Sequence, residues 1–98
     1  MDTTDMFKVL ANDARLQILQ WLKEPEHYFP SQAVDVHQVG ICVGDIQQKA
    51  GLAQSTVSHY LSMLEETGFV IATRQGHHTY YRRNEAALLE LIDRVTRL

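Results

Sequence analysis

Hydrophobic residues between positions 43 and 64 recur at the spacing of two short helices separated by a glycine. In the first helix Ile46 and Ala50 fall on the inner face, and Gly51 supplies the left-handed backbone that ends a helix at low cost. The apolar stripe of the second helix follows i, i+3, i+4 and i+7, at Val57, Tyr60, Leu61 and Leu64. Leu52 is expected to pack inside the turn. Two such helices joined by a tight turn predict a helix-turn-helix.

The face opposite this second apolar stripe is polar throughout. It carries hydroxyl, amide and imidazole side chains that suit base edges and phosphates in a major groove: Gln54, Ser55, Thr56, Ser58, His59 and Ser62. We therefore expect these residues to bind double-stranded DNA. Two alternatives stay open, a face that is only solvated and a winged helix that contacts a protein partner.

Two runs rich in Val, Ile, Thr and Tyr follow at 69–74 and 77–83, and a short loop with Gly76 separates them. This pattern predicts a β-hairpin. The expected fold is therefore mainly α with a small β-hairpin, a winged helix-turn-helix. The wing tip is expected to add DNA contacts through Arg74, Gln75, His77 and His78. Arg82 and Arg83 lie at the far end of the hairpin, where they either reach the flanking DNA backbone or stay solvated.

Apolar stripes also occupy both ends of the chain. Asn84 can cap a helix whose stripe is long for so small a domain, and a short apolar helix lies near the amino terminus. We expect these helices to form a dimer interface through Met6, Phe7, Leu10, Leu88, Leu91, Ile92 and Val95. The alternative is that both helices pack only on their own core.

Residues 24–41 contain two prolines and no sustained helical period. They predict a loop with a short strand near residues 34–39, and Tyr28 and Phe29 are its expected packing anchors. Two roles stay open for this segment, a rigid cover for the core or a surface for a partner or ligand.

Length and composition indicate one small domain over residues 1–98. The 45% hydrophobic content excludes a disordered chain, and no apolar run approaches the roughly 20 residues that cross a bilayer. The acidic amino terminus is unlike a secretory signal and the single cysteine fits a reducing compartment, so we expect a cytoplasmic protein without a membrane partner. The net charge of −3 argues mildly against DNA, but residues 41–83 hold four Lys and Arg against three Asp and Glu.

Three segments together resemble the ArsR/SmtB family of small bacterial winged-helix repressors. Residues 7–19 resemble the family's amino-terminal signature, residues 54–61 its recognition helix, and residues 64–70 the lead into the wing. The resemblance implies a homodimer whose terminal helices pack across a two-fold axis and whose recognition helices bind an inverted-repeat operator. Two departures are Ala53, where members often have a capping serine, and Gln47, where many helix-turn-helix motifs have a small residue.

Cys42 is the candidate sensor residue. In metal-sensing members a Cys-Val-Cys-Asp stretch binds thiophilic ions, but residues 42–45 read Cys-Val-Gly-Asp, so the second thiol is missing. The family's interhelical zinc site does not carry over either, because the carboxyl-terminal helix has neither His nor Cys. Asp35 and His37 could join Cys42 only if their segment folds back. We therefore expect no metal and no cofactor, and we keep redox or thiophilic-ligand sensing at Cys42 as the alternative.

Catalytic motifs are absent from the sequence. It has no Gly-rich phosphate loop, no paired carboxylates, no nucleophile elbow and no metal-hydrolase motif, so we expect no enzymatic activity. The sequence predicts a dimeric, sequence-specific transcriptional repressor. These motifs do not identify the operator, the regulated genes or any small-molecule or redox effector.

Overall fold

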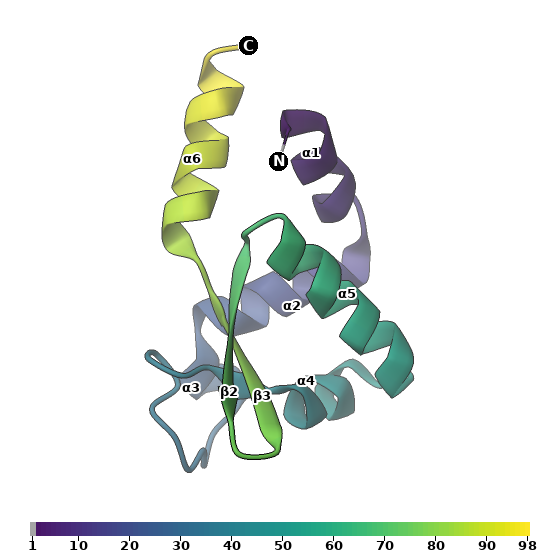
Figure 1. Cartoon of the computed structure of the whole chain (residues 1–98), viewed down its shortest axis with the longest axis vertical. Coiled ribbons are helices and arrows are strands. Elements are labelled where there is room, and N and C mark those ends of the chain that lie inside the picture. Colours follow the sequence, from purple (N-terminus) through teal and green to yellow (C-terminus); the bar gives the residue numbers. More distant parts are fainter. Residues whose placement is uncertain (1) are drawn as a thin grey trace.

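The computed structural model of the chain describes residues 2–98 (Figure 1). Its helices and strands follow the order α1 Thr3–Leu10, α2 Asp13–Lys23, α3 Pro25–Tyr28, β1 Ile41–Cys42, α4 Val43–Ala50, α5 Gln54–Glu66, β2 Val70–Gln75, β3 His78–Arg83 and α6 Glu85–Thr96. The helix-turn-helix, the hairpin and the two terminal helices that the sequence predicts are confirmed. No helix within residues 2–98 has both the length and the apolar character needed to cross a membrane.

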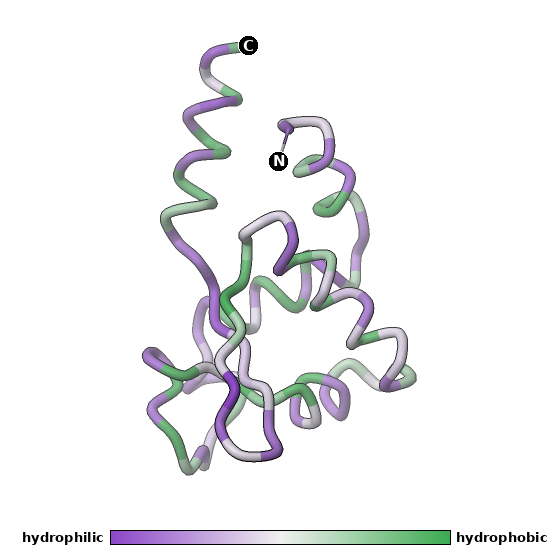
Figure 2. Tube along the Cα trace, viewed as in Figure 1, coloured by the Kyte–Doolittle hydropathy of each residue, from purple (hydrophilic) through white to green (hydrophobic). Residues whose placement is uncertain are grey.

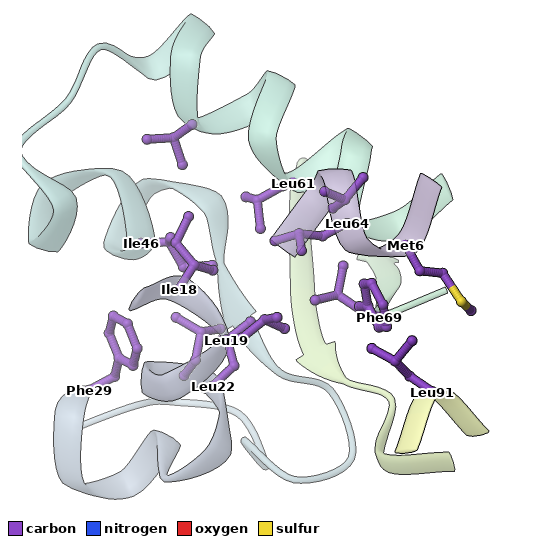
Figure 3. Close-up of a cluster of buried hydrophobic side chains, with 14 residues drawn as sticks. Met6, Ile18, Leu19, Leu22, Phe29, Ile46, Leu61, Leu64, Phe69 and Leu91 are labelled. Carbon is purple, nitrogen blue, oxygen red and sulfur yellow. The ribbon is translucent and has the colours of Figure 1, made fainter. Parts of the chain in front are cut away.

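Helices α2, α4 and α5 enclose a hydrophobic core together with the sheet (Figure 3). Of the four residues in the predicted apolar stripe of α5, Val57, Leu61 and Leu64 have no exposed surface, and Tyr60 is half-buried. Ile46 of α4 and Phe69, just before β2, are equally buried. Full burial of one such side chain stabilises the fold by about 1.5–3 kcal/mol. This cluster therefore fixes how α5 sits on the rest of the protein.

Side-chain caps begin helices α1, α2 and α6. Oδ1 of Asp2, Asn12 and Asn84 accepts a backbone N–H of the first turn at 2.8, 3.0 and 3.4 Å, respectively. The cap expected from Asn84 is therefore confirmed. Helix α5 differs, because Ala53 precedes it and makes no side-chain hydrogen bond. The start of α5 depends on packing alone.

The wing, within the described residues, is an antiparallel sheet of three strands in the order β1-β3-β2. Strands β2 and β3 pair along their whole length, from Val70 opposite Arg83 to Gln75 opposite His78. Strand β1 adds two residues on the other side of β3. The predicted hairpin is thus extended by a short strand from the segment before α4.

The prediction of a strand near residues 34–39 is wrong. Residues 36–39 form a turn, and β1 lies later, at Ile41–Cys42. Gly40 explains this position. Its φ is +108°, and a Cβ there would lie 2.3 Å from the carbonyl oxygen of Tyr81. Only glycine lets the chain approach β3 so closely. Pairing with β3 therefore begins immediately after Gly40.

The segment that follows α2 is more regular than the predicted loop. Pro25 lies in the first turn of α3, where its fixed φ favours a helix start. Phe29 is buried and Tyr28 packs against the core, which confirms both as anchors. On α4, Lys49 Nζ lies 5.3, 5.8 and 5.4 Å from the ring centres of Tyr28, Phe29 and Trp21. These cation–π contacts hold the segment against the helix-turn-helix as a cover for the core.

The terminal helices pack against each other at the end of the molecule away from the wing tip (Figure 1). The structure buries Met6 and Leu91 in the core of the same chain (Figure 3). The chain itself therefore covers these two side chains, and their expected contact with a second copy stays a prediction. Hydrophobic positions continue along α6 (Figure 2), and two of them, Ile92 and Val95, are 59% and 42% exposed.

Candidate DNA interface

The turn between α4 and α5 sets the angle between these helices. Gly51 has a φ of +67°, and its N–H donates to the Gln47 carbonyl at 3.0 Å. The Gln47 side chain in turn donates from Nε2 to the Leu52 carbonyl at 2.8 Å. Gln47, where many helix-turn-helix motifs have a small residue, therefore provides a hydrogen bond to a backbone carbonyl of the turn. Leu52 itself is 37% exposed, so the expectation that it packs inside the turn is wrong.

The outer face of α5 presents the predicted polar side chains. They are Gln54, Ser55, His59 and Ser62, which are exposed, and Thr56 and Ser58, which are half-buried. The first turn has no acidic residue, and Glu65 and Glu66 lie at the other end of the helix. The amino-terminal half therefore carries no negative charge that would repel phosphates. Because Ala53 provides no cap, the first backbone N–H groups of α5 also stay available to a phosphate oxygen.

Arg15 positions α5 from the core side, a role that sequence reasoning missed. Its side chain is buried, and Nε and Nη2 donate to the carbonyls of Val9 and Lys8 at the end of α1. The guanidinium carbon lies 5.1 Å from the ring centre of Tyr60 on α5. One side chain thus connects α1 with α5. The sequence signal was an arginine in the first turn of a capped helix, but local periodicity does not reveal its spatial neighbours.

The wing tip gathers the other predicted DNA contacts. Gly76, with a φ of +60°, lies at the bend, and the exposed side chains around it are Arg74, Gln75, His77 and His78. Arg74 makes no salt bridge within residues 2–98, so its charge is available to a phosphate. Figure 1 shows the hairpin loop and the start of α5 toward the same end of the molecule, away from the termini. One duplex could therefore meet both.

The two arginines at the far end of the hairpin do not reach this end. Arg83 donates from Nε and Nη2 to the two carboxylate oxygens of Glu85 at 2.8 Å each, and from Nη1 to the Leu19 carbonyl at 3.3 Å. Its side chain is only 16% exposed, so the expectation of a DNA contact or a solvated arginine is wrong there. Arg82 lines a cavity at the same junction, and its Nε is buried.

Cys42 directly precedes α4 and lines a cavity of about 430 Å³ together with Tyr80. Asp35 and His37 do not join it. Asp35 accepts the backbone N–H of His37 at 3.0 Å, and His37 Nε2 is paired with Glu26. In the part of the chain that the structure describes, no three His, Cys, Asp or Glu side chains are placed to hold a metal ion.

Among the described residues, Tyr81 and Glu26 have shifted pKa values, and both lie outside α5. Burial, and then the charge of Glu65, raise the pKa of the Tyr81 phenol above its usual 10.0. A backbone hydrogen bond, and then the His37 side chain, lower the pKa of Glu26 below its usual 4.5. Neither group titrates near neutral pH, so neither makes the polar face of α5 sensitive to pH there.

Comparison with known proteins agrees with this geometry. The model of bacterial regulatory proteins of the arsR family matches residues 41–72. The uncharacterized HTH-type transcriptional regulator YbzH of Bacillus subtilis is 46% identical, over 95% of this chain and 94% of its own. A biofilm growth-associated repressor of Xylella fastidiosa is 27% identical, over 94% of this chain and 68% of its own. A homodimeric winged helix-turn-helix DNA-binding domain of Mycobacterium bovis is 28% identical with a TM-score of 0.65, over 95% and 75% of the two chains.

The matches cover the parts of the chain that carry the proposed interface. The family model spans β1, α4, α5 and the start of β2, which together hold the helix-turn-helix. The Bacillus subtilis relative extends the match over almost the whole of both chains. The chain therefore belongs to the ArsR family of bacterial regulatory proteins, and it is a transcriptional regulator rather than an enzyme.

Proposed function

We propose that this chain is a dimeric repressor that binds an inverted-repeat operator in double-stranded DNA. The outer face of α5 carries the proposal, because it is polar and has no acidic residue in its first turn. Ser55 and His59 offer hydroxyl and imidazole groups to base edges, and Arg74 on the wing offers a charge to phosphate. The repressor role is supported by the Xylella fastidiosa relative, which is named as one. We place its action in the cytoplasm, where bacterial DNA lies.

The homodimer of this proposal forms through α1 and α6. Four large apolar side chains of these helices are at least 41% exposed in the single chain: Phe7, Leu89, Ile92 and Val95. A two-fold pairing of α6 with its copy would remove them from water. The Mycobacterium bovis neighbour is described as homodimeric. Two-fold symmetry would then place the two α5 helices about one DNA turn, or a multiple of it, apart.

Substitutions on α5 test the DNA contacts. Ser55→Ala and His59→Ala should each reduce the preference for the operator over unrelated DNA, because loss of recognition at one base pair costs up to about 1–3 kcal/mol, or about 5- to 150-fold. Fluorescence anisotropy at fixed salt measures both affinities, with an operator recovered from bound genomic fragments. His27→Ala, which removes an exposed histidine on α3, is the matched control and should change nothing. Unchanged discrimination in both α5 variants would refute the assignment.

Two charges on α6 test the dimer. The double substitution Ile92→Glu, Val95→Glu removes up to about 1.5–3 kcal/mol of stabilisation by apolar burial at each site in each copy. It also places charged carboxylates in the interface, where their burial is unfavourable. Sedimentation at micromolar concentration should show a monomer with unchanged helix content. Leu52→Glu places the same charge on an exposed leucine of the turn and should leave the dimer intact. A dimer that survives the double substitution would refute this interface.

A further inference from the structure

A cavity of about 490 Å³ lies where the end of α2, the segment after it and the junction between β3 and α6 meet. Leu22, Pro25 and Val36 form its apolar wall, and the first two are buried. Lys23 and Arg82 line the same space. The cavity adjoins the end of β3, whereas the wing tip adjoins its beginning. It is therefore separate from the proposed DNA face.

Positive charge gathers at this cavity although the protein's net charge is −3. Arg83 and His37 also line it, but Arg83 is bound to Glu85 and His37 is paired with an acidic residue of α3. Lys23 and Arg82 have no salt bridge to any of residues 2–98. Glu85 is the acidic residue of the lining, and its carboxylate is bound to Arg83, so within the described residues Lys23 and Arg82 share the cavity without a salt-bridge partner. Such a concave, positively charged site raises the local concentration of anions.

Arg82 also carries an unsatisfied donor. Its Nε is buried and has no hydrogen-bond partner in the described part of the chain. Buried N–H groups are nearly always paired, because leaving one without an acceptor is unfavourable. A guanidinium is a planar fork of donors that matches the two oxygens of a carboxylate. The Arg82 guanidinium therefore has donor capacity that the described residues leave unused, and an anionic ligand in the cavity could use it.

We propose that this cavity binds a small organic anion, a carboxylate attached to a compact apolar body. The carboxylate lies between Lys23 and Arg82, and the apolar body lies against Leu22, Pro25 and Val36. Because the lining continues into the first turn of α6, such a ligand contacts both the base of the wing and a helix of the proposed dimer interface. The binding site itself does not depend on how α5 meets DNA.

Phenylacetate is a suitable probe, and neutral phenylacetamide is its matched analogue. Phenylacetate added to isotopically labelled, DNA-free protein at constant ionic strength should saturably shift the amide NMR signals of Lys23, Arg82 and Asn84. Phenylacetamide should bind at least about tenfold more weakly, because it cannot make charge-assisted hydrogen bonds. No DNA is present, so a failure of α5 to recognise DNA leaves this result unaffected.

Two variants locate the site. Arg82→Gln and Lys23→Gln should each weaken phenylacetate binding by about tenfold. Arg97→Gln removes an exposed cation at the end of α6 and should not weaken it. Lys23 is exposed, so its variant keeps the test valid if Arg82→Gln fails to fold. Equal binding of the two probes, the absence of saturable shifts at these residues, or undiminished binding by Lys23→Gln would overturn the proposal.

Discussion

Ala53 occupies the N-cap position of the proposed recognition helix without capping it. Its φ of −62° and ψ of 145° are the extended conformation in which a threonine hydroxyl accepts an N–H of the first turn. Its carbonyl already accepts the N–H of Val57 at 3.1 Å, so the helix geometry at this position is in place. Ala53→Thr should therefore stabilise the protein by about 1 kcal/mol. For a domain of this size the melting temperature should rise by about 4–8 °C.

Thermal unfolding followed by circular dichroism measures this change, at one fixed protein concentration because a dimer melts in a concentration-dependent way. Ala53→Val is the matched control. Valine has nearly the shape of threonine but no hydroxyl, so it should not raise the melting temperature. Equal melting temperatures for the threonine and valine variants would refute the reasoning that the first turn of α5 lacks a cap acceptor.

Other predictions concern backbone, sensing and pH. Gly40→Ala should lower the free energy of unfolding by at least about 2 kcal/mol, because its φ and its contact with β3 both exclude a Cβ. Gly44→Ala, on α4 with open space around its Cβ, should raise it by up to about 1 kcal/mol, and similar urea midpoints for both would contradict this. Zinc, cadmium or arsenite in stoichiometric excess should not release native or Cys42→Ser protein from operator DNA in anisotropy titrations; release that the serine variant loses would disprove this. The Glu26 carboxyl should titrate below 4.5 by NMR, and His37→Gln should raise its pKa; an unchanged pKa would count against the pairing. Because folding lowers this pKa, the pairing stabilises the protein fully above the unfolded-state pKa, and this contribution is lost as pH falls through the folded-state pKa.

The helix-turn-helix and the wing could be predicted because their signals are local. The stripe of Val57, Leu61 and Leu64 defines the buried face of α5 by helical period, and the polar residues opposite it must then face outward. Gly51 and Gly76 mark the turns, and both have positive φ. Each of these features depends on residues that are close together in the sequence. Neighbouring residues alone therefore specify them.

The segment after α2 could not be predicted in the same way. Helix α3 spans four residues and β1 spans two, so neither completes a recognisable period. Strand β1 is fixed by the close approach of Gly40 to Tyr81, which is far away in the sequence. Long-range contacts of this kind leave no periodic signal.

A hydrophobic stripe in the sequence also does not predict which part of the protein, or which partner, covers it. Met6 lies on the apolar stripe of α1, and Leu91 shares that of α6 with Ile92 and Val95, yet only Met6 and Leu91 are buried by the chain itself. In the sequence Arg83 looks like a free cation, but in the fold its side chain binds Glu85 and the Leu19 carbonyl of α2. Which part of an amphipathic helix meets its own core, and which part meets a second copy, depends on how the helices are arranged in space.

Sequencing of the genomic fragments that the purified protein binds, taken from the organism that encodes it, tests the central claim most directly. A two-fold dimer with α5 in the major groove predicts one shared motif, an inverted repeat whose half-site centres are about 10–10.5 base pairs, or a multiple, apart. Bound fragments without a common motif, or with a direct repeat or a single half-site, would contradict the account.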